Sequence, residues 1–270
     1  HTIFNILATV VFIPFTPLVA KLILHYFPDE EIDRDITRPA VMHLDENTLE
    51  TPAIAITNAQ AEIRGVIGLL ERVVGSIARP FVSNEPLGDV ENEEEDFEKG
   101  LQNRTEKITF LNDKISSYLI KINNQDLTDL QSKEVFALVS VVNNVNSIKN
   151  SVGLRLHDLI IKKEMEEGGL PDMLMNEVES FHKKMVKQIK RLGKFFEKYD
   201  QIKIDKIISS GKKYKNLEEK YRIDYIKRSN VKSDETKSSV IYQELMDMFK
   251  EISIFIDLIA ERLSELQTDK

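Results

Sequence analysis

The 270-residue sequence contains no cysteine and has only ten glycines and eight prolines. The absence of cysteine excludes disulfides, thiolate nucleophiles and zinc sites built from cysteine. The scarcity of glycine and proline argues against a turn-rich β fold and favours long helices. Because 41% of the residues are hydrophobic and 30% are charged, the chain can still bury a core.

The sequence also lacks the motifs of the common enzyme classes. It contains no HExxH, no GxxxxGK[ST], no GxGxxG and no GxSxG pattern. The five histidines are scattered along the chain: His1, His25, His43, His157 and His182. We expect His157 and His182 to lie at the surface and not to bind metal. We therefore expect no enzymatic activity and no cofactor bound to this chain.

Charge is unevenly distributed along the chain, whose net charge is −8. Residues 29–100 hold 18 acidic and 6 basic side chains, whereas residues 182–228 hold 16 basic and 6 acidic ones. The basic stretch could bind an anionic partner. Alternatively, acidic and basic helices pair with each other and with solvent. No groove-reading or RNA-binding motif is present, so we expect no nucleic-acid partner.

Residues 2–20 carry no charged side chain. As a helix, such a run spans about 28 Å, close to the hydrocarbon thickness of a bilayer. The basic region that begins a signal peptide is missing, since Lys21 follows the apolar run. The alternative is a buried helix of a soluble domain. We expect residues 1–27 to cross a membrane and, because the chain starts at His1, to belong to a longer polypeptide.

The remaining sequence predicts an all-α domain. Residues 28–50 read as an acidic linker, and apolar residues then recur every three or four positions. Thr51 and Thr128 suit helix N-caps, and Ile252 and Phe255 fall on the predicted buried stripe of the last helix. Helices are predicted over about 51–80, 96–122, 128–168, 171–199, 204–228 and 234–266. Three helices thus occur twice, which predicts two three-helix bundles in tandem, residues 51–169 and 170–270.

Short motifs near the start of the chain resemble a known family. His1-Thr2-Ile3-Phe4-Asn5 leads into an apolar run with Phe12-Ile13-Pro14-Phe15, and Leu49-Glu50-Thr51-Pro52-Ala53 follows the linker. This combination resembles the last transmembrane helix of bacterial sodium/phosphate cotransporters and its junction with a cytoplasmic domain similar to the phosphate-signalling regulator PhoU. The resemblance implies a PhoU-like tandem of two three-helix bundles behind a terminal transmembrane helix.

The function implied by this resemblance is sodium-driven uptake of inorganic phosphate at the cell membrane, tuned by the cytoplasmic helical domain. Phosphate and sodium ions would bind in membrane helices upstream of His1, and membrane lipid and a regulatory protein would be further partners. The alternative is a membrane-anchored helical interaction protein without transport activity. Several hydrophobic spans upstream of His1 would favour the transporter, and a lone anchor would favour the alternative.

The resemblance also implies where a metal would bind. PhoU-like domains carry a Glu-x-x-x-Asp signature in the third helix of each repeat, and carboxylates with this spacing share one helix face. Here Asn146 and Asn150 occupy the two positions in the first repeat, and Lys250 and Ile254 occupy them in the second. Amides are weak ligands and an ammonium group repels cations. We therefore expect no metal site of the family's type.

Overall fold

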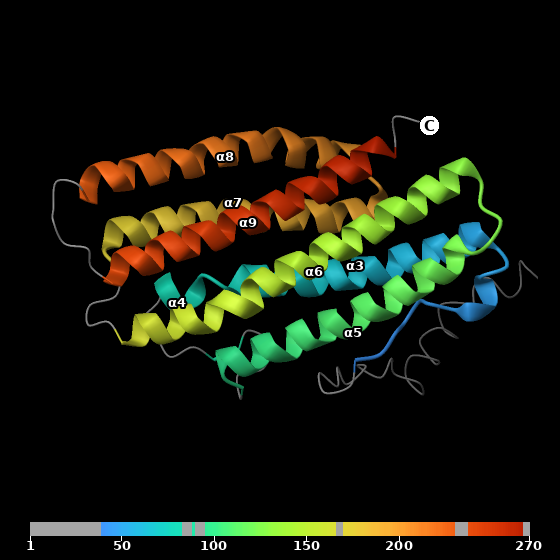
Figure 1. The fold of residues 1–270 in the computed structure, drawn as a ribbon, viewed down its shortest axis with the longest axis horizontal. Coiled ribbons are helices and arrows are strands. Elements are labelled where there is room, and N and C mark those ends of the chain that lie inside the picture. The colour runs from blue at the N-terminus through green and yellow to red at the C-terminus, as the bar shows by residue number, and fades with distance from the viewer. Residues whose placement is uncertain (1–38, 83–87, 90–94, 166–169, 230–236, 267–270) are drawn as a thin grey trace, which may run out of the picture. The chain divides into compact units, whose positions relative to one another are not determined.

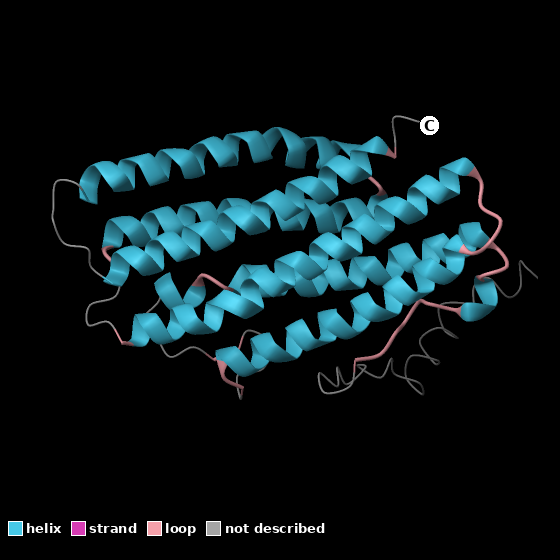
Figure 2. Ribbon diagram, in the orientation of Figure 1, coloured by secondary structure: helices cyan, strands magenta, loops and turns pink. Residues whose placement is uncertain are grey.

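The computed structural model describes residues 39–82, 88–89, 95–165, 170–229 and 237–266 (Figure 1). In these ranges the regular elements are helices, and the single β-bridge joins Gly88 to Asp96 (Figure 2). The prediction of an all-α fold is confirmed for this part of the chain. The predicted membrane segment, residues 1–27, and linker residues 28–38 lie outside the described residues. Among the described helices, none combines the length and the apolar content needed to cross a membrane.

Six long helices make up the described domain. They are α3 (Pro52–Ser76), α5 (Phe97–Asn123), α6 (Asp129–Glu164), α7 (Asp172–Lys198), α8 (Gln201–Ser229) and α9 (Lys237–Glu265). Two short elements accompany them, the 3-10 helix η2 (Glu46–Thr48) and the one-turn helix α4 (Arg79–Val82). Each of the six sequence segments predicted to be helical overlaps one of the long helices, and each end differs by no more than a few residues.

Local side chains fix several helix ends. The Asp96 carboxylate accepts the N–H group of Lys99 at 2.7 Å and caps α5. Thr128 and Gln131 form a reciprocal capping box at the start of α6, as the sequence predicts for Thr128. At the end of α7, Tyr199 adopts a left-handed backbone conformation with φ of 51°. This conformation is usually left to glycine, and here it turns the chain from α7 into α8.

The helices pack in two groups that share one core. α3, α5 and α6 contact one another, and so do α7, α8 and α9. Two further contacts, α6 with α9 and α3 with α7, join the groups, so that α5 and α8 lie at opposite edges (Figure 1). The buried apolar residues of all six helices form one continuous cluster. That the two groups are repeats of one another, with the predicted boundaries, stays a prediction.

The buried stripe of α9 differs in one position from the predicted one. Ile252 is fully buried, as expected, whereas Phe255 is only partly buried. The stripe runs through Phe249, Ile252, Ile256 and Ile259, all of them fully buried. With the stripe continuing at Ile256, Phe255 falls at its edge. The prediction that Phe255 lies in the core was therefore wrong.

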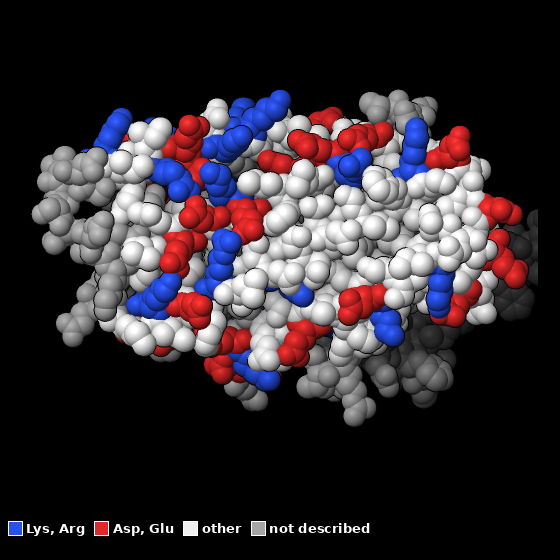
Figure 3. Space-filling model, in the orientation of Figure 1, with Lys and Arg blue, Asp and Glu red and all other residues white. Residues whose placement is uncertain are grey.

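Acidic and basic side chains are interspersed on the surface shown in Figure 3. Lys190 of the basic stretch approaches Glu71 of the acidic stretch at 3.8 Å. Arg222, also of the basic stretch, pairs with Asp247 of α9 at 2.5 Å. These contacts support the second interpretation of the charge pattern, in which acidic and basic helices pair with each other.

Candidate functional site

The interface between α8 and α9 contains a row of charged residues in addition to apolar ones. Its centre is Glu218 of α8, a carboxylate that is only 2% exposed. Arg222, one helical turn further along α8, donates to Glu218 Oε1 from Nε at 3.0 Å and from Nη2 at 2.7 Å. Lys250 of α9 lies 3.3 Å from the other carboxylate oxygen. We call Glu218, Arg222, Asp247 and Lys250 the charged seam.

The four charges of the seam cancel. Arg222 Nη2 also donates to Asp247 of α9 at 2.5 Å, so that one guanidinium bridges two carboxylates on two helices. Hydrogen bonds to Asp247 and then to Glu218 raise the pKa of Arg222 above its ordinary value. Removing either partner of such a network leaves a charge uncompensated, which costs far more than the net strength of the pair. The seam therefore fixes the position of α8 on α9, and it does not present an unpaired cation to an anion.

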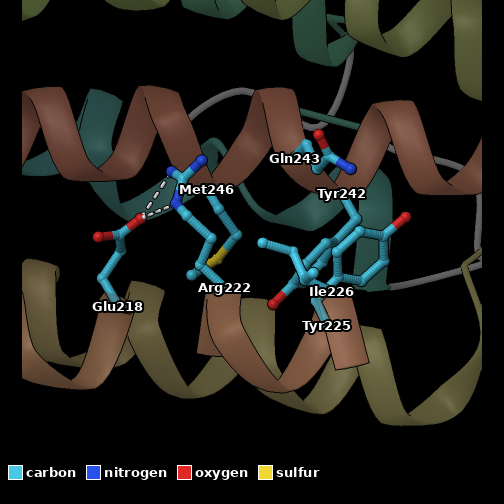
Figure 4. Close-up of a pocket in the computed structure, with 7 residues that line it drawn as sticks. All are labelled: Glu218, Arg222, Tyr225, Ile226, Tyr242, Gln243 and Met246. Atoms are coloured by element: carbon cyan, nitrogen blue, oxygen red, sulfur yellow. Dashed lines mark hydrogen bonds and ion pairs between the residues drawn. The ribbon is translucent and has the colours of Figure 1, made fainter. Parts of the chain in front are cut away.

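A small cavity flanks Glu218 on one side. Its volume is about 90 Å³. Figure 4 shows Arg222 between Glu218 and two tyrosines that line the far wall. The rings of Tyr225 and Tyr242 lie 5.2 Å apart between centroids. The remaining lining residues are Ile226, Gln243 and Met246. A space of this size holds a few water molecules, and it is much smaller than a typical cleft for a cofactor or drug-sized ligand.

A third helix bonds to one of the tyrosines that line this cavity. The Tyr242 hydroxyl donates to Glu177 of α7 at 2.6 Å, and Arg228 of α8 donates to both oxygens of the same carboxylate at 3.0 and 3.2 Å. Burial and this hydrogen bond raise the pKa of Tyr242 above its ordinary value of 10.0. Glu177 thus joins α7, α8 and α9 through one side chain.

A second cavity of about 90 Å³ lies on the other side of Glu218. It is lined by α7, α8 and α9 through Phe181, Gly211, Lys215, Glu218, Lys250, Ser253, Ile254 and Asp257. Burial, together with the charge of Glu261, raises the pKa of Asp257 to about 7. The group therefore changes its charge in the physiological range.

Two of the four signature positions reach this region. Lys250 pairs with Glu218, and Ile254, which is 49% exposed, lines the second cavity. Asn146 and Asn150 are exposed on α6, and in the described part of the chain neither forms a side-chain hydrogen bond. The described residues contain no group of three or more acidic or histidine side chains placed to hold a metal ion. The expectation of no family-type metal site stays a prediction.

The prediction that His182 is exposed was wrong. His182 is 8% exposed, and its Nε2–H group donates to the carbonyl oxygen of Val74 at 2.7 Å. α7 packs against α3 here, and the basic residues after His182 point elsewhere because each residue turns the helix by about 100°. The prediction that His157 lies at the surface is confirmed, and its Nδ1 is 3.2 Å from Glu98 Oε1.

Sequence reasoning missed Glu218 and Asp257. The spacing of Glu218 and Arg222 was a readable signal, because residues four apart share a helix face. The buried pair of Asp89 and Arg104, with contacts at 2.6 and 2.9 Å, was also missed. Asp89 lies in the connection before α5 and Arg104 lies inside α5, and no local sequence pattern predicts that they pair.

Comparison with known proteins found relatives of low identity over the whole chain. The chain is 24% identical over 279 residues to the "Putative inorganic phosphate export protein YjbB" of Escherichia coli K12 and of Shigella flexneri. It is 23% identical over 279 residues to the protein of the same name from Salmonella typhimurium. These matches cover 100% of this chain and 48% of each relative, so the chain spans about half their length. No family model and no solved structure matches. The names of the relatives indicate phosphate transport in general.

Proposed function

We propose that this chain is the C-terminal part of an inorganic phosphate transporter and that its helical domain regulates transport. The observation that carries the proposal is the match along the entire chain to proteins named for phosphate export. The short motifs before and after the predicted linker support the same assignment. Because the chain covers 48% of each relative, transport is assigned to the complete protein and not to this chain alone.

The charge pairing in the domain argues against phosphate binding there. The cations of the charged seam, Arg222 and Lys250, are engaged with Glu218 and Asp247. An anion such as phosphate would have to displace the buried carboxylate of Glu218 as well as the exposed carboxylate of Asp247, and the first step has a large cost. We therefore assign the transported phosphate to membrane helices of the complete protein and assign the domain no catalytic step.

Sodium coupling is the finer part of the proposal. The resemblance implies that sodium drives phosphate into the cell, whereas the relatives are named for export. A secondary transporter moves its substrate in the direction that the combined gradients favour, so both directions have to be measured. We propose sodium as the coupling ion and the cell membrane as the location, with the helical domain on the cytoplasmic side.

The test is phosphate flux through the complete protein reconstituted in lipid vesicles. Radiolabelled phosphate should cross the membrane in the presence of a sodium gradient, and the flux should fall when potassium or choline replaces sodium. Flux that ignores sodium would overturn the coupling but keep phosphate transport. No flux under any gradient, in a protein that is folded and inserted, would favour the membrane-anchored interaction protein.

A second experiment tests the membrane segment and the role of the domain. The chain of residues 1–270 should sediment with membranes, and removal of residues 1–28 should release the helical domain. In the complete protein, deletion of residues 51–270 should leave phosphate flux measurable but change its rate or its response to phosphate supply. Release of the intact chain without detergent would refute the membrane segment.

A further inference from the structure

Two aspartates lie directly against the backbone of a helix at a glycine. A Cβ atom added to Gly100 of α5 would lie 2.1 Å from Cγ of Asp89. A Cβ atom added to Gly211 of α8 would lie 2.2 Å from Oδ2 of Asp257 on α9. Both distances are too short for any real Cβ atom. A side chain at either glycine would therefore oblige the neighbouring carboxyl group to move.

The two carboxyl groups differ in their partners. Arg104 donates to both oxygens of Asp89, at 2.9 and 2.6 Å, and the two side chains are almost completely buried. Asp257, in contrast, forms no hydrogen bond or ion pair within the described part of the chain. A partly buried carboxylate without a counter-charge is disfavoured relative to its neutral form. Burial and the neighbouring Glu261 accordingly raise the pKa of Asp257 to about 7.

The surroundings of Asp257 offer its ionised form an alternative position. From α8, Lys215 and Glu218 face the cavity of about 90 Å³ beside it; from α9, Lys250 does. α7 contributes Phe181, which carries no charge. Lys250 is already held by Glu218 at 3.3 Å, and Lys215 is exposed. Asp257 and Gly211 both line this cavity, so an ionised carboxylate is drawn towards its water and its ammonium groups and away from Gly211.

We propose that Asp257 is a proton-controlled latch that holds α8 against α9. The neutral carboxyl group packs on Gly211 and closes the contact between the helices. Ionisation draws the carboxylate and water into the cavity and loosens α8. This helix is susceptible because it lies at the edge of the domain (Figure 1) and about half of its described side chains are exposed. The proposal concerns the helical domain itself and does not depend on phosphate transport.

Hydrogen exchange of α8 in the whole chain of residues 1–270, in detergent, tests the latch. Wild type and Asp257→Asn are compared at the same pH, so that the intrinsic pH dependence of exchange cancels. From pH 6 to pH 8 the exchange rate of α8 in the wild type, relative to the variant, should rise about tenfold, because the ionised fraction of Asp257 rises from about one-tenth to about nine-tenths. At pH 6 the two proteins should exchange at similar rates.

Asp247→Asn on the same helix is the matched control. Asp247 is exposed and paired with Arg222, so this change should alter exchange equally at pH 6 and pH 8. Equal exchange of wild type and Asp257→Asn at both pH values would overturn the latch. A difference of the same size at both pH values would also overturn it, because the effect would then be independent of the proton.

Gly211→Ala tests the contact independently of the proton. The added methyl group must push the Asp257 side chain away, so α8 should exchange faster than in the wild type at both pH 6 and pH 8. Unchanged exchange in this variant would show that the close contact does not hold α8, and would overturn the proposal.

Discussion

Glu62 Oε2 accepts the backbone N–H group of His43 at 2.7 Å, and it accepts the N–H group of Met42 at 3.1 Å. Glu62 lies on α3 and is only 4% exposed. A second anchor comes from α5, where the Tyr118 hydroxyl donates to the carbonyl oxygen of Asp45 at 2.8 Å. The chain that leads into α3, which includes η2, is therefore anchored by side chains of two helices.

Replacing Glu62 should loosen this segment. Glu62→Ala leaves the N–H groups of Met42 and His43 without their acceptor, and we expect a loss of about 1.5–3 kcal/mol of unfolding free energy, the range for hydrogen bonds to charged groups. Urea unfolding followed by circular dichroism measures the change. Glu50→Ala, at an exposed position in the same segment, should stay within about 0.5 kcal/mol. Equal losses in both variants would contradict the anchoring role.

The buried pair of Asp89 and Arg104 should be intolerant of half-removal. Arg104→Ala leaves the Asp89 carboxylate buried without its cation, and we expect a cost of about 3–5 kcal/mol. Lys183→Ala serves as the control because it breaks an exposed ion pair with Glu179, 2.7 Å long, and should cost no more than about 0.5 kcal/mol. Thermal unfolding of the two variants separates these cases, and a mild effect of Arg104→Ala would show that Asp89 finds another partner.

The stripe of α9 predicts a graded response to truncation. Ile252→Ala removes a fully buried side chain and should cost about 2–5 kcal/mol. Phe255→Ala should cost less than a core phenylalanine, because Phe255 is only partly buried. Lys213→Ala, at an exposed position of α8, should remain within about 0.5 kcal/mol. A larger loss from Phe255→Ala than from Ile252→Ala in urea titrations would contradict the burial pattern of α9.

His182 should make the domain sensitive to acid. Burial lowers its pKa below the ordinary value of 6.5, so the unfolded chain takes up the proton more readily than the folded one. The unfolding free energy should therefore be unaffected by this group above pH 6.5 and decrease as the pH falls below that value. In His182→Gln the decrease between pH 7 and pH 5 should be smaller. An identical pH dependence in both proteins would rule out this contribution.

Metal ions should not stabilise the domain. Asn146, Asn150, Lys250 and Ile254 supply no paired carboxylates, so we expect no shift in melting temperature with iron, zinc or magnesium, and none with a chelator. A metal at about 100 times its dissociation constant would add about 2.7 kcal/mol, which calorimetry detects easily. Asn146→Glu combined with Asn150→Asp should create affinity. A metal-dependent rise in the melting temperature of the wild type that a chelator abolishes would show that other residues bind the metal.

The helix pattern was predictable because its signals are local. Pro52 follows Thr51 at the first position of α3, and Thr128 with Gln131 opens α6 through side-chain bonds within one turn. Three- and four-residue spacing of apolar residues then locates each buried stripe. Phe255 shows the precision of this reasoning, since the spacing found the correct helix but not which residue lies at the edge of the stripe.

The candidate site was not predictable in the same way because its contacts join different helices. His182 reads as surface in a basic run, and only the packing of α7 on α3 buries it against Val74. No sequence pattern around Gly211 predicts its contact with Asp257, because the two residues meet only when α8 packs on α9. A charged residue in the sequence is thus expected either to be exposed to solvent or to pair with an opposite charge. Only the tertiary structure shows which of the two applies.

The contacts of α6 with α9 and of α3 with α7 have a consequence for cooperativity. Separating the two helix groups would expose apolar faces on four helices at once, which is a large hydrophobic cost. The domain should therefore unfold in a single transition, with neither group stable in isolation. A substitution or a bound partner at either edge then changes the free energy of the same folded state. The two groups are therefore thermodynamically coupled, and this coupling needs no conformational change.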